Sequence, residues 1–64
     1  MKIQWKNKYS QETGYVKCLN RKEGYFENTY VEDEAKDFAK SNVKRIIKQL
    51  ESYCGDNEYV AIEA

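Results

Sequence analysis

The sequence predicts a small α+β domain in which one amphipathic helix packs on one face of a β-sheet. Three observations lead to this prediction: polar and apolar residues alternate near the start, turn-forming residues recur at short intervals, and a long stretch has apolar residues at helical spacing. The expected order is β-β-β-α-β, or β-β-α-β if the third strand is vestigial. The chain has 64 residues, no proline and no Gly/Ser-rich linker. Residues 1–64 should therefore form a single domain with one core layer.

The first predicted strand spans residues 2–9. Polar and apolar side chains alternate there, with Ile3, Trp5 and Tyr9 on one face. Gln4 and lysines occupy the other face, and alternation of this kind is typical of a half-buried strand. We therefore expect this strand to present one face to the core and one basic face to solvent.

Two further strands follow, and a turn introduces each of them. The first turn, over residues 10–14, includes Gly14, which can supply a positive φ if the hairpin needs one. The second turn spans residues 20–24 and also ends in a glycine. The second and third strands are expected over residues 15–19 and 25–29, and the three strands form an antiparallel meander.

One helix is predicted after the meander. Thr29 and Glu32 have the spacing of a capping box, and acids crowd the next turn, where the helix dipole favours negative charge. Gly55 ends the helix. Asn42 interrupts the apolar face and Ser41 before it can cap a new start, so we expect a kink or break near this serine. The apolar face consists of Ala35, Phe38, Ala39, Val43, Ile46, Ile47, Leu50 and Tyr53.

Residues 58–62 form the last predicted strand. A right-handed crossover through the helix would place this strand parallel to the first. The sheet would then carry the helix on one face and leave the other face open. That open face is the expected working surface, and it would also serve a homodimer, a common way for a small domain to gain stability.

Charge is sorted along the chain, although the net charge is zero. Residues 1–22 carry six basic groups and one acid, whereas residues 23–64 carry five basic groups and ten acids, which gives about +5 and −5. Such a two-signed molecule favours recognition through an oriented surface. Two separate basic surfaces are expected, one on the first hairpin and one on the helix.

The residue types argue against an enzyme. The chain has no histidine, which removes the commonest general base and the commonest metal ligand. Cys18 and Cys54 lie far apart in no metal-binding spacing and are expected to be reduced, half-buried thiols. The sequence shows no phosphate-binding glycine loop and no catalytic triad pattern. We therefore expect no catalytic residue, no cofactor and no metal.

The first candidate surface would bind a protein. Tyr15 and Tyr59 alternate with the apolar residues of their strands and are predicted to lie on the open sheet face, where tyrosine is a good interface anchor. Strand propensity explains the same tyrosines without a partner. A ridge of lysines at intervals of four residues follows one side of the predicted helix, and either solvation or an acidic partner explains it. This ridge consists of Lys36, Lys40, Lys44 and Lys48.

The alternative surface would bind DNA or RNA through the basic hairpin. Lysines would contact phosphates and nearby rings would contact bases. The same pattern is explained by a solvated face whose lysines discourage edge-to-edge pairing of strands. In addition, the net charge of the chain is zero, whereas nucleic-acid-binding domains usually have excess positive charge. The residues of this alternative are Lys2, Lys6, Lys8, Arg21 and Lys22.

Several motifs together resemble small phage- and prophage-encoded accessory proteins. The matching segments are Gly24-Tyr25-Phe26, Glu34-Ala35-Lys36 followed by Phe38, and Tyr59-Val60-Ala61-Ile62. That group has an N-terminal hairpin, an "EAK-x-F" helix start and a closing strand, and it includes inhibitors of host defence such as anti-CRISPR proteins. The resemblance implies a non-catalytic protein that binds a host protein to inhibit or redirect it. It assigns no functional residue.

A second, weaker resemblance is to the arm-binding domain of phage integrases, which reads DNA with a three-stranded sheet. Trp5, the turn over residues 22–26 and Glu34-Ala35 carry it, and the acidic stretch over residues 27–37 departs from it.

The N-terminus lacks the apolar stretch of a signal peptide, and no apolar run approaches the ~18 residues that span a bilayer. A cytoplasmic location in a bacterial host cell, without membrane contact, is therefore expected.

Overall fold

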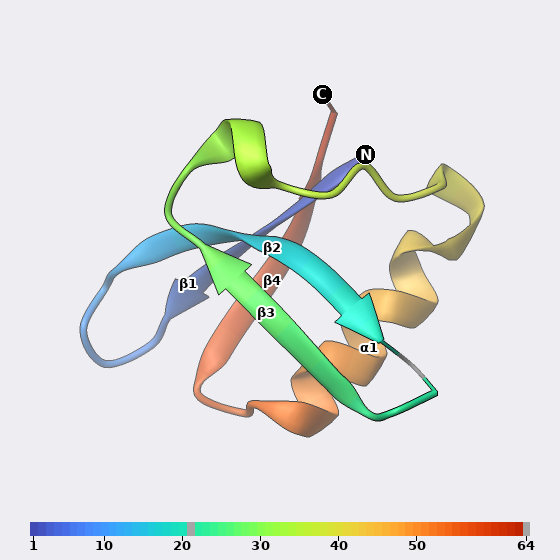
Figure 1. The fold of residues 1–64 in the computed structure, drawn as a ribbon. Coiled ribbons are helices and arrows are strands. Elements are labelled where there is room, and N and C mark those ends of the chain that lie inside the picture. Colours follow the sequence, from blue (N-terminus) through green and yellow to red (C-terminus); the bar gives the residue numbers. More distant parts are fainter. Residues whose placement is uncertain (21, 64) are drawn as a thin grey trace.

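The computed structural model describes residues 1–20 and 22–63 and confirms the α+β class (Figure 1). A four-stranded antiparallel sheet with strand order β3-β2-β1-β4 packs against one α-helix. Two 3₁₀ turns lie between the third strand and the helix. The elements are β1 (Lys2–Asn7), β2 (Thr13–Asn20), β3 (Tyr25–Thr29), the 3₁₀ turns Glu32–Glu34 and Lys40–Asn42, α1 (Val43–Tyr53) and β4 (Asn57–Ile62).

The last strand runs antiparallel to the first, so the expected parallel arrangement is wrong. β4 pairs with the whole of β1, from Ile62 opposite Lys2 to Asn57 opposite Asn7. The apolar periodicity predicts a helix that follows β3 directly and returns the chain across the sheet. Instead, residues 30–42 carry the chain to the start of β1, and α1 then runs in the same direction as β1 (Figure 1). The strand after α1 must therefore return antiparallel to β1.

The helix is shorter than expected, because it begins at Val43 and not near residue 30. The capping box does not form, and the Thr29 hydroxyl accepts a bond from the N–H of Val31 instead (3.1 Å). Residues 35–39 leave the first 3₁₀ turn in an extended conformation. The break expected near residue 41 is the start of the helix, with Asn42 as the N-cap residue.

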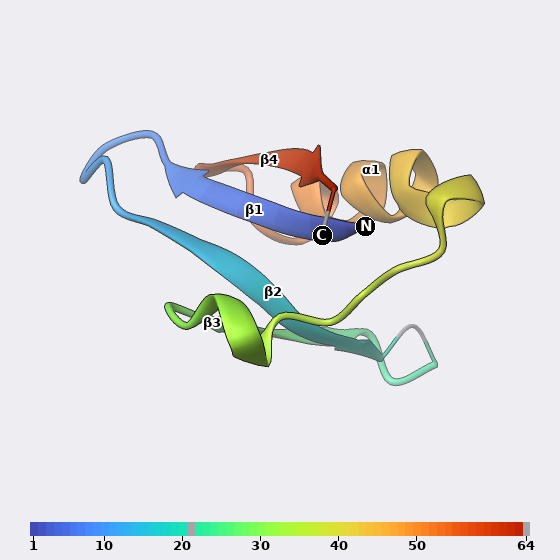
Figure 2. The ribbon, with the colours of Figure 1, turned by 90° about the horizontal axis from the view of Figure 1, so that it is seen from above.

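The extended residues fill a gap between two strands. β1 pairs with β2 at three positions only, and the two strands then diverge (Figure 2). In the opening, the N–H of Lys36 donates to the Val16 carbonyl (3.1 Å) and the N–H of Phe38 donates to the Met1 carbonyl (2.7 Å). These bonds and the burial of the Phe38 ring replace the helical bonds that the sequence pattern predicts.

The core lies between the sheet and α1. Trp5 spans the junction between β1 and β2, and its indole N–H donates to the Tyr15 carbonyl (3.1 Å). A Cβ on Gly14 would lie 2.5 Å from the Trp5 ring, so this glycine is needed for its missing side chain. It does not supply a positive φ, which occurs at Gln11 (66°) in that turn. The buried core is Ile3, Trp5, Val16, Phe38, Val43, Ile46, Leu50 and Tyr59.

The predicted apolar face of the helix is confirmed only in part. Ile47 packs against the core from a half-buried position, whereas Tyr53 is exposed and stacks on Phe26 of β3 (ring centroids 5.9 Å apart). Ala39 is exposed in the connection. The four members that lie in the core are Phe38, Val43, Ile46 and Leu50. Cys18 and Cys54 are free and half-buried, as expected.

Candidate partner-binding surface

The face of the sheet opposite α1 gathers side chains from three strands. Gln4 of β1 lies between Tyr15 of β2 and Val60 of β4 in the strand register. Side chains at these positions point away from the buried residues that alternate with them. We call this surface the outer face, and it consists of Lys2, Gln4, Lys6, Thr13, Tyr15, Glu58, Val60 and Ile62.

The outer face is shallow and chemically mixed. Val60 is 53% exposed, and Lys6 and Glu58 are exposed opposite each other on neighbouring strands. A hollow of about 130 Å³ lies between these residues, Gln4 and Thr13. Enclosed ligand sites usually have volumes of roughly 300 Å³ or more. The hollow on the outer face is therefore too small to enclose a small molecule of that kind.

The side chains of Tyr15 and Tyr59 lie on opposite faces of the sheet. Tyr15 lies half-buried on the outer face, as predicted. The prediction for Tyr59 is wrong, because it pairs with Trp5 and is buried on the side of α1. Its hydroxyl accepts a bond from the Asn57 side chain (3.4 Å), and burial raises the pKa of its phenol. The more apolar residues of β4, Val60 and Ile62, take the outer face instead.

The predicted lysine ridge does not form, because its members belong to three elements. Only Lys44 and Lys48 lie on α1. Lys36 is in the extended connection with its ammonium 5.7 Å from the centre of the Phe38 ring, and Lys40 is in the second 3₁₀ turn. The structure still brings Lys40 and Lys44 together, beside Ala61, around an apolar hollow of about 410 Å³.

The basic residues of the alternative surface are also dispersed. Lys2 and Lys6 lie on the outer face, where the Lys2 ammonium donates to the Glu32 carbonyl (3.0 Å). Lys8 lines a hollow beside α1, and Lys22 lies in the turn between β2 and β3. Arg21 lies outside the described residues. The described members of the set therefore do not form one basic patch.

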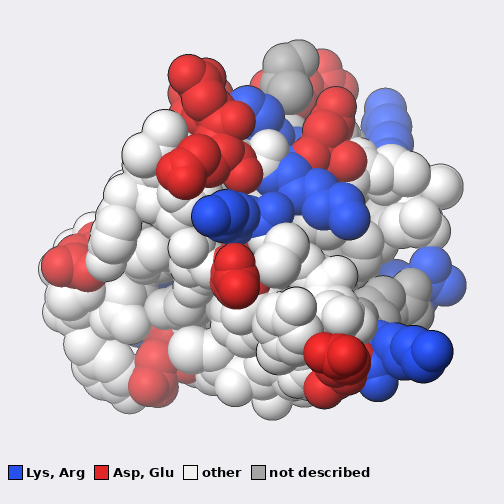
Figure 3. Space-filling model, in the orientation of Figure 1, with Lys and Arg blue, Asp and Glu red and all other residues white. Residues whose placement is uncertain are grey.

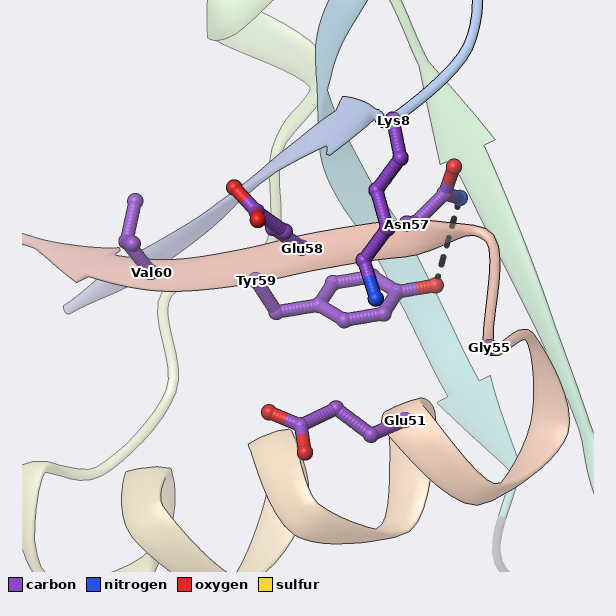
Figure 4. Close-up of a pocket in the computed structure, with 7 residues that line it drawn as sticks. All are labelled: Lys8, Glu51, Gly55, Asn57, Glu58, Tyr59 and Val60. Atoms are coloured by element: carbon purple, nitrogen blue, oxygen red, sulfur yellow. Dashed lines mark hydrogen bonds between the residues drawn. The ribbon is translucent and has the colours of Figure 1, made fainter.

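The structure also shows a hollow that the sequence analysis missed. It has a volume of about 510 Å³ and lies along β4 near the end of α1 (Figure 4). The side chain of Lys8 extends past the Tyr59 ring, and Glu51 lies on the α1 side of the hollow. These residues are far apart in the sequence, and no spacing pattern links them. Only the alternation within residues 57–62 indicates that an exposed strand borders this site.

Charges of both signs are interspersed on the surface around the β2–β3 side of the molecule (Figure 3). Lys17 of β2 lies 3.9 Å from Glu34, and the Met1 ammonium contacts Asp37 (2.5 Å). This ammonium lowers the pKa of the Asp37 carboxyl through a hydrogen bond and its charge. The Tyr30 hydroxyl donates to Glu12 (3.1 Å), which raises the pKa of the tyrosine. This face therefore lacks the single-signed field that attracts a polyanion.

Within residues 1–20 and 22–63, no three or more Cys, Asp or Glu side chains gather in a way that would hold a metal ion. In the same part of the chain, no helix is long and apolar enough to cross a membrane. Comparisons with protein-family models, with curated proteins and with solved structures find no match. The functional proposal therefore depends on surface geometry and on the resemblance of the sequence motifs.

Proposed function

We propose that this chain is a non-catalytic accessory protein of a phage or mobile element, which binds a host protein through the outer face and inhibits or redirects it. The observation that carries the proposal is the position of Gln4, with Tyr15 on one side and Val60 on the other. An aromatic and an aliphatic side chain thus flank a hydrogen-bonding amide on three rigid strands. Such an arrangement is ordered before the partner arrives, which lowers the entropic cost of binding.

The outer face has the distribution of side chains that protein interfaces use. Its centre holds Tyr15 and Val60, and the charged Lys2, Lys6 and Glu58 surround them. Protein interfaces commonly have an apolar centre and a polar rim, with about 800 Å² buried on each partner. The described chain has 4403 Å² of accessible surface, so a contact of that size would cover about a fifth of it.

The phage or mobile-element origin and the anti-defence role, such as that of anti-CRISPR proteins, rest on the sequence motifs. Gly24 lies in the β2–β3 turn, Tyr25 and Phe26 lie in β3, and the closing residues 59–62 lie in β4. The "EAK-x-F" motif differs from the expected helix start, because residues 35–39 are extended here. The hairpin and the closing strand therefore carry the resemblance.

Binding of DNA or RNA is a second candidate because Lys2 and Lys6 lie on the same face as Tyr15. Glu58 opposite Lys6 and the dispersal of the remaining basic residues favour a protein partner over this candidate. Retention on duplex DNA separates the two. Affinity that falls steeply between low and physiological salt would support nucleic-acid binding, and no retention at low salt would eliminate it.

The principal test is affinity capture from a bacterial host lysate, with and without nuclease treatment. We expect a protein that remains bound after nuclease treatment and is lost with Lys6→Glu or Tyr15→Ser. Lys22→Glu is the matched control, since it makes the same charge change in the exposed β2–β3 turn. Capture that requires intact nucleic acid, or that responds equally to Lys6→Glu and Lys22→Glu, would contradict the proposal.

A further inference from the structure

The two edges of the sheet differ in how well they could accept another strand. At one edge, β3 pairs with β2 across a register shift between Val16 and Cys18, which bends the ladder. At the other edge, all six residues of β4 pair with β1 in unbroken register. β4 carries only one charged side chain, Glu58. Proteins usually protect such an edge with charges, prolines or bulges, and this strand has few of these devices.

The backbone groups of β4 that face outward can be assigned from one bond. The N–H of Lys8 donates to the carbonyl of Asp56 directly opposite (2.8 Å), which makes this a hydrogen-bonded pair. Such pairs alternate along an antiparallel ladder. Glu58, Val60 and Ile62 therefore direct their backbone groups toward β1, and the alternate residues direct theirs toward the free edge. The free edge offers the N–H and C=O groups of Tyr59 and Ala61.

We propose that two copies of this chain join antiparallel through β4, around a two-fold axis at Val60, into one continuous eight-stranded sheet. Tyr59 of each copy then forms hydrogen-bonded pairs with Ala61 of the other, which satisfies the outward backbone groups. The exposed Val60 lies against its own counterpart. This inference goes beyond the proposed function, because it concerns the β4 edge and a second copy in place of a host protein.

The side chains beside the β4 edge are complementary under this symmetry. On the α1 side, Lys44 borders the hollow beside Ala61, and Glu51 borders the hollow beside Tyr59. Because the two-fold axis places Ala61 next to Tyr59 of the partner, Lys44 faces Glu51 of the partner, and this contact occurs twice. The half-buried Ile47 lies between them along α1 and supplies apolar surface near the axis.

The outer side of the edge fits the same register. Glu58 lies opposite Ile62 of the partner, and Ile62 pairs with Lys2 in its own copy. Glu58 and Lys2 of the partner are therefore two strand spacings apart, about 9–10 Å between their backbones, with Ile62 of the partner between them. Both copies place α1 on the same side of the joined sheet, so their two outer faces form one surface.

The first test uses charge reversal in two single variants. Lys44→Glu places two acids together at both contacts, and Glu51→Lys places two bases together. We expect each variant alone to dimerise at least about tenfold more weakly than the unmodified chain, as for close like-charge pairs. An equimolar mixture of the two variants restores one opposite-charge pair at each contact and should form a heterodimer. Sedimentation velocity over a series of concentrations measures both effects.

Matched controls make the same charge changes away from the edge. Lys22→Glu and Glu23→Lys lie in the exposed β2–β3 turn and should leave the dimer unchanged. An unmodified chain that stays monomeric at millimolar concentration overturns the proposal. A dimer that the charge reversals weaken no more than the controls do, or that the mixture does not restore, also overturns it.

The second test removes one outward donor. Ala61→Pro deletes an N–H that faces the free edge and leaves the bonds between β4 and β1 in place, which is where proline is tolerated in a sheet. We expect a monomer whose circular dichroism matches the unmodified chain. A folded Ala61→Pro variant that dimerises normally contradicts pairing through β4. Capture of a host protein by the monomeric variant is measured separately. Because capture tests binding through the outer face and sedimentation tests pairing through β4, one proposal can fail without the other.

Discussion

The two halves of the molecule are built differently. In one half, β1 and β4 pair along their whole length and pack on α1, whose Val43, Ile46 and Leu50 are buried. In the other half, β2 and β3 form a ribbon with a register shift, and its apolar Leu19 and Phe26 are only partly buried. The half with β1, β4 and α1 therefore contains most of the core, whereas the β2–β3 half is attached to it through a short junction.

That junction depends on few residues. β1 and β2 pair at three positions, and the Trp5 ring lies against Gly14 at one of them. Tyr30, which follows β3, meets the same ring edge to face (centroids 5.6 Å apart). Beyond the pairing, the extended residues 35–39 bridge the gap between the halves. Stability in the two halves should therefore respond differently to matched substitutions.

The largest effect is expected for Leu50→Ala in α1. Leu50 is fully buried, so the substitution should leave a cavity and lower the free energy of unfolding by about 2–5 kcal/mol. Leu19→Ala makes the same change in the half-buried ribbon and should cost no more than about half as much, since less apolar area returns to water. Urea denaturation measures both. Equal losses would show that the two halves share the core evenly.

Gly14→Ala is expected to have the next largest effect. The new methyl group would lie 2.5 Å from the Trp5 ring and 2.6 Å from the Thr29 carbonyl oxygen, so the junction must open. Overpacking of this kind typically costs about 1–3 kcal/mol. Gly55→Ala is the control, because nothing lies within 4 Å of a Cβ there. A junction that tolerates both substitutions equally would mean that Trp5 can move freely.

Hydrogen exchange should distinguish the halves without a mutation. β1 pairs with a neighbouring strand on each side and lies over the core, whereas β3 is an edge strand beside a register shift. We therefore expect the β3 amides to exchange through openings of lower free energy than those of β1. NMR-detected exchange at several urea concentrations gives these free energies. Identical values in both strands would indicate that the molecule opens only as one unit.

The smallest effect is expected at Asp37, which is one of the bridging residues 35–39. The Met1 ammonium lowers the pKa of this carboxyl in the folded state. Its contribution to stability is therefore present above the unfolded pKa of about 3.9 and lost as the pH falls through the lower folded value. Asp37→Asn should remove this dependence of the free energy of unfolding on acidic pH and should slightly lower that free energy at neutral pH. Thermal melts between neutral and strongly acidic pH measure it, and an unchanged acid profile would show that the contact is unimportant.

Sequence reasoning located the strands better than the connections. The alternation in residues 2–9 predicts the inner Ile3 and Trp5, and the structure confirms both. The same alternation is wrong for Tyr9, because β1 ends at Asn7 and Tyr9 is 80% exposed in the turn that follows. The helical pattern was misleading before Val43, since Phe38 is buried from an extended segment. There, hydrogen bonds to other strands compete with local helical bonds, and a periodicity argument contains no information about such distant partners.

The candidate surface was predicted in part for the same reason. Local alternation predicts Tyr15 on the open face, and this position is confirmed. The same argument predicts Tyr59 on that face too, because Val60 and Ile62 are the more apolar pair in β4. The register with β1 decides the question, since Tyr59 lies opposite the inward Trp5. In β4 both alternating sets contain apolar residues, so only the register with β1 fixes which set is buried.

By itself, the sequence determined the α+β class, the three-stranded meander and the apolar stripe of α1 from Val43 to Leu50. These features arise from contacts between residues near in the chain, which leave a periodic pattern. Only the tertiary structure decided the direction of β4, the extended path of residues 35–39 and the dispersal of the lysine ridge. Each of these depends on which distant backbone groups find hydrogen-bond partners, and that choice is made only when the two halves meet.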